Sequence, residues 1–398
     1  MAQDQRPPFA HLCHPDRLFR ELPTPCYVLD EAQLRRNGEI LASVARNTGA
    51  KILLAQKAFS NYDLYPVLAP YLAGTEASGL YEARLGREHM PQGETHVFCA
   101  AYRPDEFDAL LGYADHIVFN SPRQLEKFGA AARAAGKCVG LRINPECSTQ
   151  EGHAIYDPCA PGSRLGTTRA QWDAQMTPAL VSMLDGLHFH TLCEQDADAL
   201  ETTLDAVAEK FGDVLPGMQW LNFGGGHHIT RPGYDLPRLE RCIRRAQEKW
   251  NVTVYLEPGE ACALNAGYLV TTVLDLPANG EIKLAILDMS AACHTPDVIE
   301  MPYRPPLFAA GGAGEKAFSY RLGGPTCLSG DVIGDYSFDA PLQEGDRLIF
   351  GDMAIYTTCK NNTFNGMPLP GIWVLHENRT LEQLRSFGYQ DFKSRLGR

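Results

Sequence analysis

The chain has 398 residues and a formal net charge of -12, with 44% hydrophobic and 21% charged residues. This composition is ordinary for a soluble globular protein, and the length predicts two or three domains, or one α/β barrel with a smaller domain. The acidic excess, with no Lys/Arg-rich run, argues against nucleic acid or an anionic membrane as a partner. It favours a cationic small molecule.

Neither a membrane-spanning segment nor a secretory signal is expected. No stretch approaches about 18 consecutive apolar residues, and the first residues, MAQDQRPPFAHLCHPDR, contain no apolar core. The twelve cysteines are scattered without a C-x-x-C pair, which predicts reduced thiols and no metal site. We therefore expect a cytoplasmic protein.

Strand-like and helix-like segments alternate from about residue 51 to residue 259. The predicted strands cover residues 51–58, 75–79, 95–101, 116–120, 138–145, 186–192, 220–226 and 252–259. Helical patterns cover residues 31–47, 62–73, 80–89, 104–114, 122–136, 169–184, 198–211 and 236–250. Eight such units predict a closed (β/α)8 barrel, and a doubly wound open sheet is the alternative.

The pattern changes after residue 259. Apolar runs at 268–276, 281–290, 318–324 and 346–356, separated by Gly, Pro and Asn, predict antiparallel β structure. The early strand at residues 25–30 is expected to pair with it. We therefore predict a barrel domain at 31–265 and a β-rich domain formed by 1–30 and 266–398.

Polar residues gather at the predicted carboxyl ends of the barrel strands, where barrel enzymes place their active sites. In strand order they are Lys57, Ser78, Asn120, Arg142, His188, His190, Gly224, Gly225, Gly226 and Glu257. Lys57 follows an apolar run in which an unpaired ammonium group is costly, so it is a candidate Schiff-base lysine.

The three glycines after the seventh strand allow backbone amides to approach a phosphate. A Schiff-base lysine beside a phosphate site predicts pyridoxal 5'-phosphate. Glu257 is then expected to meet the pyridine nitrogen. One histidine of the sixth strand is expected to stack on the ring, and the strand pattern does not choose between His188 and His190 because both share one face.

Six motifs occur in an order that resembles the fold-type III pyridoxal-phosphate decarboxylases, which include ornithine and diaminopimelate decarboxylases. They are Lys57, F-H-T-L-C at 189–193, the glycines at 224–226, E-P-G at 257–259, G-P-T-C at 324–327 and Tyr356. The resemblance implies an alanine racemase-like barrel with a C-terminal β domain. It also implies a head-to-tail homodimer with shared active sites.

The same resemblance implies roles for individual residues. Lys57 carries the cofactor, His190 stacks on its ring and Glu257 meets its nitrogen, while Cys327 is a catalytic cysteine that enters from the partner subunit. The remaining cofactor-binding residues implied are Ser78, Arg142, Cys193, Gly224, Gly225, Gly226 and Tyr356.

Two positions depart from ornithine and diaminopimelate decarboxylases: Glu260 replaces the usual arginine, and Cys193 replaces the phosphate-site serine. The sequence also contains D-M-S-A at 288–291 and H-T-P-D-V-I-E-M-P-Y-R at 294–304. With these features it most resembles the carboxynorspermidine and carboxyspermidine decarboxylases of polyamine biosynthesis. A carboxylated triamine needs carboxylates for its ammonium groups, and we expect Glu260, Asp297 and Asp331 to supply them.

Three alternatives remain. A diaminopimelate or other basic amino-acid decarboxylase would share most motifs. A racemase on the same barrel needs a second base across the ring and leaves G-P-T-C without a purpose. A cofactor-binding regulatory protein without activity should have lost Lys57 or Cys327, and both are present.

Overall fold

The computed structural model describes residues 9–150 and 157–397. The chain divides into two compact units, one formed by Arg35–Cys262 and the other by the described part of Met1–Leu34 together with Ala263–Arg398. In these described ranges, no helix is long and apolar enough to cross a membrane.

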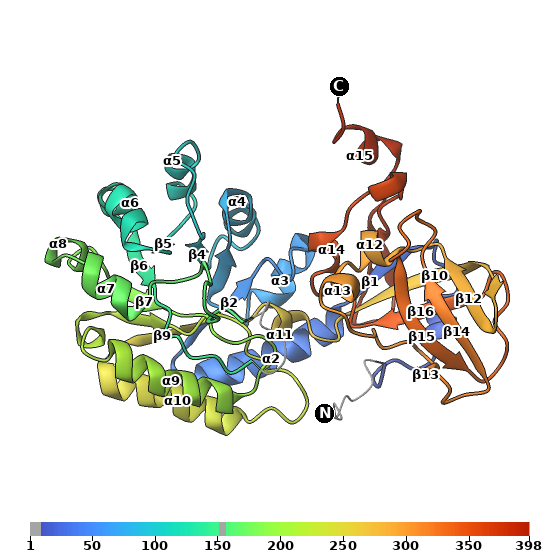
Figure 1. Ribbon diagram of the computed structural model, residues 1–398, viewed down its shortest axis with the longest axis horizontal. Coiled ribbons are helices and arrows are strands. Elements are labelled where there is room, and N and C mark those ends of the chain that lie inside the picture. The colour runs from blue at the N-terminus through green and yellow to red at the C-terminus, as the bar shows by residue number, and fades with distance from the viewer. Residues whose placement is uncertain (1–8, 151–156, 398) are drawn as a thin grey trace. The chain divides into compact units, whose positions relative to one another are not determined.

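The first unit contains a closed barrel of parallel strands, seen in Figure 1. Its strands are β2 (Lys51–Ala55), β3 (Gly74–Ala77), β4 (Glu94–Phe98), β5 (His116–Phe119), β6 (Cys138–Arg142), β7 (Gly186–His188), β8 (Trp220–Asn222) and β9 (Thr253–Leu256). The barrel closes where β2 pairs with β9, with Lys51 opposite Tyr255 and Ile52 opposite Leu256. The predicted (β/α)8 barrel is confirmed, and the open-sheet alternative is wrong.

The helices of this unit follow the predicted order. They are α2 (Glu31–Thr48), α3 (Tyr65–Leu68), α4 (Leu80–His89), α5 (Phe107–Leu111), α6 (Pro122–Ala134), α7 (Arg169–Gln175), α8 (Pro178–Val181), α9 (Ala197–Phe211), α10 (Leu236–Trp250) and α11 (Glu260–Ala263). The single helix predicted at 169–184 is broken into α7 and α8. Pro178 cannot continue a helix, and the Thr177 side chain caps the new one by accepting from Leu180 N.

Helix α10 shows how the sequence sets its own boundaries. Asp235 accepts a hydrogen bond from Arg238 N at the start, and Asn251 takes the left-handed conformation (φ 56°) at the end. Arg238 and Arg245 form ion pairs with acidic residues of α9.

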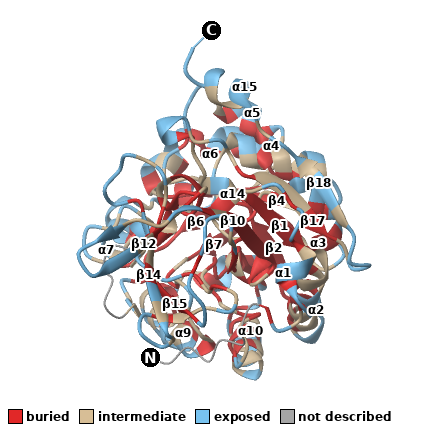
Figure 2. Ribbon diagram, turned by 90° about the vertical axis from the view of Figure 1, so that its right-hand side faces the viewer, coloured by how far each residue is buried: buried red, intermediate tan, exposed pale blue. Residues whose placement is uncertain are grey.

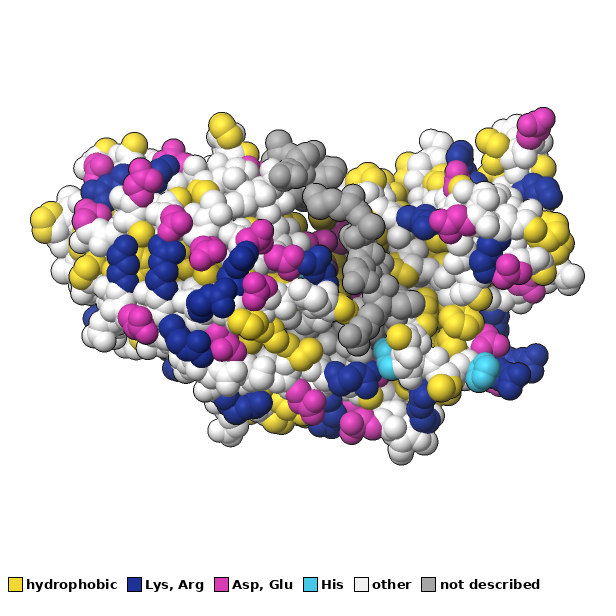
Figure 3. All heavy atoms as spheres, turned by 90° about the horizontal axis from the view of Figure 1, so that it is seen from below, with side chains coloured by type: hydrophobic (Ala, Val, Ile, Leu, Met, Phe, Trp, Pro, Cys, Tyr) yellow, Lys and Arg dark blue, Asp and Glu magenta, His cyan; other side chains and the backbone are white. Residues whose placement is uncertain are grey.

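Basic and acidic side chains are interspersed on the face shown in Figure 3, so the described residues form no continuous basic surface there.

The barrel interior is filled by large side chains that face glycines. Trp220 of β8 lies against Gly140 and Gly186, where an added Cβ atom would come within 2.3 Å and 2.1 Å of its ring. Leu53, Val118 and Tyr255 complete this cluster. The barrel strands are mostly buried, while the helices of this unit carry exposed residues (Figure 2).

The second unit is built on a ten-stranded mixed sheet with the main order β13-β15-β14-β12-β10-β1-β17-β18. Its strands are β1 (Cys26–Asp30), β10 (Gly267–Asp275), β11 (Ala278–Asn279), β12 (Ile282–Leu287), β13 (Gly311–Gly312), β14 (Phe318–Gly323), β15 (Val332–Phe338), β16 (Arg347–Gly351), β17 (Gly371–Leu375) and β18 (Leu381–Arg385). Its α-helices are α1 (Pro15–Leu18), α12 (Ala291–His294), α13 (Asp297–Glu300), α14 (Thr357–Lys360) and α15 (Tyr389–Lys393).

Strand β1 lies between β10 and β17, so the expectation that the early strand joins this sheet is confirmed. The expectation of a purely antiparallel sheet is wrong, because β1 pairs with β17 and β12 pairs with β14 in parallel. The segment between β12 and β14 contains α12, α13 and β13. A crossover of that length permits the parallel arrangement.

Candidate active site

Lys57 lies in the turn that follows β2, and its side chain is exposed in the single chain. The prediction that an apolar strand end desolvates its ammonium group is therefore wrong. Strand β2 ends at Ala55, and Lys57 lies two residues later, in the turn and outside the buried run of the strand. Lys57 is accessible at the rim of the barrel, as a nucleophilic lysine must be.

Glu257 follows β9 directly, is only 4% exposed and accepts two side-chain hydrogen bonds. His188 Nε2 donates to its Oε2 over 2.9 Å, and Asn222 Nδ2 donates to its Oε1 over 2.6 Å. Burial alone raises the pKa of Glu257, but these partners outweigh it and the pKa is lowered. Burial lowers the pKa of His188, so a neutral imidazole donates to an ionised carboxylate.

Two more ionisable side chains are buried near Glu257. Glu76 of β3 has a pKa raised well above its usual range by burial and by the charge of Glu257, so its neutral form is favoured. Arg142 ends β6, stacks its guanidinium 4.6 Å above the Phe98 ring and donates to His190 O over 3.0 Å. Burial lowers the pKa of Arg142 to about 10, which still leaves it protonated.

Glu76 and Asn222 were not predicted from the sequence. A carboxyl group inside the fully buried strand Gly74–Ala77 was the available signal for Glu76. Asn222 gave no comparable signal, because its function depends on the partner that the neighbouring strand supplies.

His190 is held in one orientation by the glycine loop. Gly225 N donates to His190 Nδ1 over 3.1 Å, so the neutral ring carries its hydrogen on Nε2. Burial lowers the pKa of His190 well below its usual range, and the charges of Lys57 and Arg142 lower it further. His190 is therefore neutral, while His188 is engaged with Glu257.

The glycines of the loop are required by close backbone contacts. Gly224 (φ 68°) and Gly226 (φ 79°) adopt the left-handed conformation. A Cβ atom on Gly226 would lie 2.0 Å from Leu192 O, and one on Gly225 would lie 2.6 Å from Glu257 O. The loop therefore packs directly on the segments that carry His190 and Glu257.

Only part of this loop can donate to an anion. Gly224 N donates to Asn222 Oδ1 and Gly225 N to His190, so both amides are occupied. Within residues 9–150 and 157–397, the amides of Gly226 and His227 have no acceptor. A phosphate would meet these two donors, which with an ionised carboxylate and an accessible lysine fit pyridoxal phosphate.

The other predicted rim residues have different surroundings. Ser78 is exposed, accepts from Cys99 Sγ at its carbonyl over 2.8 Å and lines a cavity of about 180 Å³. Cys193 is half-buried in the loop after β7. Asn120 hydrogen-bonds the backbone of residues 164–166, so it orders that loop. Glu260, the first residue of α11, pairs with His228, with 3.3 Å between Oε1 and Nε2.

Cys327 and Asp331 belong to the second unit. Cys327 is exposed, and its amide donates to Asn365 Oδ1 over 2.9 Å. Asp331 is 4% exposed and accepts from Ser290 Oγ over 3.0 Å and from Thr326 Oγ1 over 2.6 Å. Asp331 therefore stabilises the turn that carries Cys327, and its expected role in binding substrate stays a prediction.

Asp297 and Tyr356 belong to the same unit. Asp297 begins α13 and, with Glu300, forms an ion pair with Lys360 of α14. Tyr356 is half-buried at the start of α14 in the left-handed conformation (φ 54°). The expected substrate-binding role of Asp297 and cofactor-binding role of Tyr356 stay predictions.

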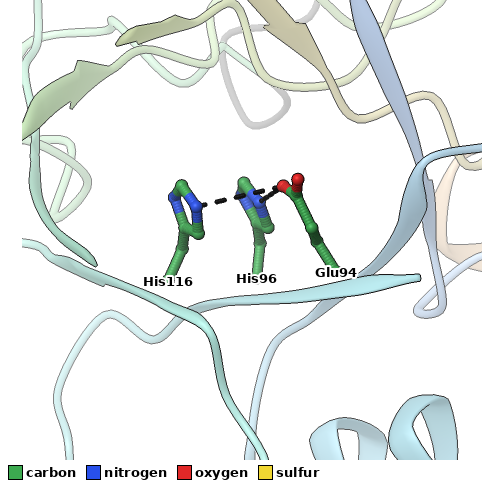
Figure 4. Close-up of side chains that lie close together, drawn as sticks. All are labelled: Glu94, His96 and His116. Atoms are coloured by element: carbon green, nitrogen blue, oxygen red, sulfur yellow. Dashed lines mark hydrogen bonds and ion pairs between the residues drawn. The ribbon is translucent and has the colours of Figure 1, made fainter. Parts of the chain in front are cut away.

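A second polar cluster lies at the amino-terminal ends of the barrel strands, opposite the rim that holds Lys57. Glu94, His96 and His116 bring their donor atoms within 4.8 Å of one another (Figure 4). The two imidazoles stack with centroids 3.8 Å apart and planes at 11°. Parallel rings cannot both aim a lone pair at one ion, and Lys51 already pairs with Glu94. We assign the cluster to barrel stability.

The sequence matches a known family of enzymes over most of its length. Residues 26–354 match the family described as pyridoxal-dependent decarboxylase, C-terminal sheet domain. The chain belongs to this family: it is a pyridoxal-phosphate-dependent decarboxylase of the ornithine, diaminopimelate and arginine decarboxylase group.

The similar proteins narrow the class further. The chain is 41% identical over 388 residues to the carboxynorspermidine/carboxyspermidine decarboxylase of Campylobacter jejuni, covering 95% of this chain and 99% of that one. It is 42% identical over 377 residues to the carboxyaminopropylagmatine decarboxylase of Synechocystis, covering 94% and 96%. The crystal structure of Campylobacter jejuni carboxynorspermidine decarboxylase with norspermidine superimposes with a TM-score of 0.85 at 40% identity, covering 94% and 100%.

The hydrogen bond from His188 should contribute to the stability of the apoprotein. His188→Leu removes the donor and leaves Glu257 with Asn222 alone, whereas His188→Gln keeps an amide donor. We expect the leucine variant to be less stable than the glutamine variant by about 1–3 kcal/mol at pH 7. Urea unfolding measures the difference, and equal stabilities would show that the bond contributes nothing.

His116 should make the protein acid-sensitive. Burial lowers its pKa from 6.5 to about 3, so below pH 6.5 the unfolded chain binds a proton that the folded chain refuses. Stability is therefore lost as the pH falls from 6.5 toward 3. His116→Gln abolishes this loss, so the stability of the wild type relative to the variant should fall between pH 7 and pH 5. A constant difference in urea unfolding would contradict the assignment.

Proposed function

We propose that this enzyme decarboxylates carboxylated triamines, namely carboxynorspermidine and carboxyspermidine. The observation that carries the proposal is the identity of 40–41% to the Campylobacter jejuni enzyme over nearly the whole of both chains. Diaminopimelate decarboxylases and a lysine/ornithine decarboxylase match at only 23–26%. The products are norspermidine or spermidine and carbon dioxide, which places the enzyme in polyamine biosynthesis.

A second candidate substrate is carboxyaminopropylagmatine, because the Synechocystis enzyme is as similar as the Campylobacter jejuni one. The candidates share the reacting end, an amino group and a carboxylate on one carbon. They differ at the distal end, where agmatine carries a guanidinium group in place of an ammonium group. The two candidate substrates therefore require different protein groups only at the distal cation.

Pyridoxal phosphate, when bound, supplies a ring that can accept the electrons of the bond between the substrate Cα and its carboxylate. Lys57 would supply the amino group that holds the cofactor. Ionised Glu257, fixed by His188 and Asn222, would accept a hydrogen bond from a protonated pyridine nitrogen. His190 presents a neutral ring face, so it adds no charge that competes for the electrons.

The carboxylate departs as carbon dioxide, and a proton must replace it on Cα. We assign this proton transfer to the thiol of Cys327, whose exposed turn is held by Asp331. We propose that Cys327 comes from the partner subunit, so that the β-rich domains complete the shared sites of a homodimer. Tyr356 is assigned to the phosphate, and Asp297 to a distal ammonium group of the substrate.

A reducing compartment suits this chemistry. None of the twelve cysteines forms a disulfide, and burial raises the pKa of the Cys26 thiol to about 12. Catalysis by Cys327 needs a reduced thiol. We therefore infer a cytoplasmic location.

Substrate preference tests the proposal directly. Purified enzyme should release carbon dioxide from carboxynorspermidine or carboxyspermidine with a kcat/KM at least about a hundred-fold above that for ornithine, lysine or diaminopimelate, because unmatched distal groups leave buried partners unpaired. Carboxyaminopropylagmatine belongs in the same series. A preference for it would select the second candidate, and efficient turnover of diaminopimelate would contradict both.

Subunit mixing tests the shared site. Lys57→Ala and Cys327→Ala proteins should each be inactive. If Cys327 acts in the partner's site, each heterodimer regains one intact site, so a random mixture should reach up to about a quarter of full activity. Mixing without subunit exchange is the control. No recovery despite proven exchange would place Cys327 in the site of its own chain or remove it from catalysis.

A further inference from the structure

The ion pair between His228 and Glu260 is almost enclosed. The side chains are 12% and 17% exposed, and Nε2 lies 3.3 Å from Oε1. Thr230 Oγ1 donates to Ala261 O over 2.7 Å, which ties the loop of His228 to helix α11. Two loops of the same rim are therefore joined by one charged contact and one neutral hydrogen bond.

The backbone of His228 connects the two segments that the phosphate is expected to touch. Gln195 N donates to Gly226 O over 3.0 Å, and His228 N donates to Gln195 O over 3.1 Å. Cys193, which is expected to belong to the cofactor site, lies two residues before Gln195. His228 therefore lies beside both the glycine loop and the segment of Cys193.

The charges around this position disfavour a phosphate unless a cation is present. Glu260 and Glu194 both face His228. Arg231 also faces it, but its charge is paired with Asp196. Burial alone lowers the pKa of His228, yet the ion-pair contact with Glu260 outweighs burial, and the pKa of His228 is raised.

We propose that His228, held as a cation by Glu260, binds the phosphate of the cofactor. Nε2 lies in the ion pair with Glu260, so Nδ1–H is the group of His228 that would donate to the phosphate. Gly226 N and His227 N complete the site. The carboxylate of Glu260 then supports a phosphate ligand instead of meeting a substrate ammonium group. The inference rests on the proposed cofactor site, but not on which amine is the substrate.

Cofactor binding to the apoprotein tests this assignment without any turnover. The dissociation constants of pyridoxal 5'-phosphate and of pyridoxal are measured by absorbance for the wild type, His228→Asn, His228→Lys and Glu260→Gln. Both compounds are expected to react with Lys57. The ratio of their dissociation constants therefore isolates the contribution of the phosphate group to binding. Inorganic phosphate is the third probe, as a competitor. His89→Asn is the control, because His89 ends α4 at the opposite end of the barrel.

His228→Asn should weaken pyridoxal 5'-phosphate roughly ten- to a hundred-fold and leave pyridoxal unchanged. In the wild type the advantage of the phosphate should fall as the pH rises through the pKa of His228. Glu260→Gln should move this fall to lower pH, and His228→Lys should abolish it between pH 6.5 and 8.5. Inorganic phosphate should compete with the cofactor in the wild type and less in His228→Asn.

An unchanged ratio in His228→Asn would overturn the proposal, as would equal weakening of both compounds, which indicates a structural role. If His228→Asn does not fold, Glu260→Gln decides. A higher substrate KM with an unchanged ratio would return Glu260 to the role of an ammonium ligand. Failure to decarboxylate carboxynorspermidine would not alter these ratios, so the two proposals fail separately.

Discussion

Closure of the barrel between β2 and β9 is the constraint on which the active site depends. Residues far apart in sequence, Lys57 and Glu257, follow these two strands and reach the same rim because the strands pair. Ala55 N donates to Pro258 O over 3.3 Å just beyond the regular pairing. A Cβ atom on Gly259 would lie 2.7 Å from Ala58 Cβ and 3.0 Å from Ala55 O. In the E-P-G motif, Gly259 therefore allows the close contact that closes the barrel, and Glu257 supplies the carboxylate of the active site.

A closed barrel also restricts which charges its mouth can hold. Two buried carboxyl groups near each other cannot both ionise cheaply. The structure resolves this conflict by giving Glu257 two hydrogen-bond donors, while the pKa of Glu76 is raised so that its neutral form is favoured. His188 and His190 remain neutral, so the nearby positive charges are those of Lys57 and Arg142. Of these two carboxyl groups, Glu257 is the one whose ionised form is stabilised, and it lies where the ring nitrogen of the cofactor is expected.

The sequence predicted the barrel well because each strand has an apolar run and each following segment a helical period. It predicted the rim residues because the ends of parallel strands share one edge. It could not separate His188 from His190, since only the position of Glu257 does so. It also misjudged Lys57 and missed Glu76. Exposure and protonation depend on neighbours from other strands, and the parallel pairing of β12 with β14 depends on a crossover that periodicity does not reveal.

The rim formed by barrel closure is expected to be a pyridoxal phosphate site built on Lys57. Borohydride reduction of the holoprotein, followed by proteolysis and mass spectrometry, tests it most directly. Reduction makes the bond between the cofactor and its lysine permanent, so the modified peptide identifies that lysine. We expect a single pyridoxyl group on Lys57, lost in Lys57→Ala. A pyridoxyl group on any other lysine, or none on the reduced wild-type holoprotein, would show that Lys57 does not hold the cofactor.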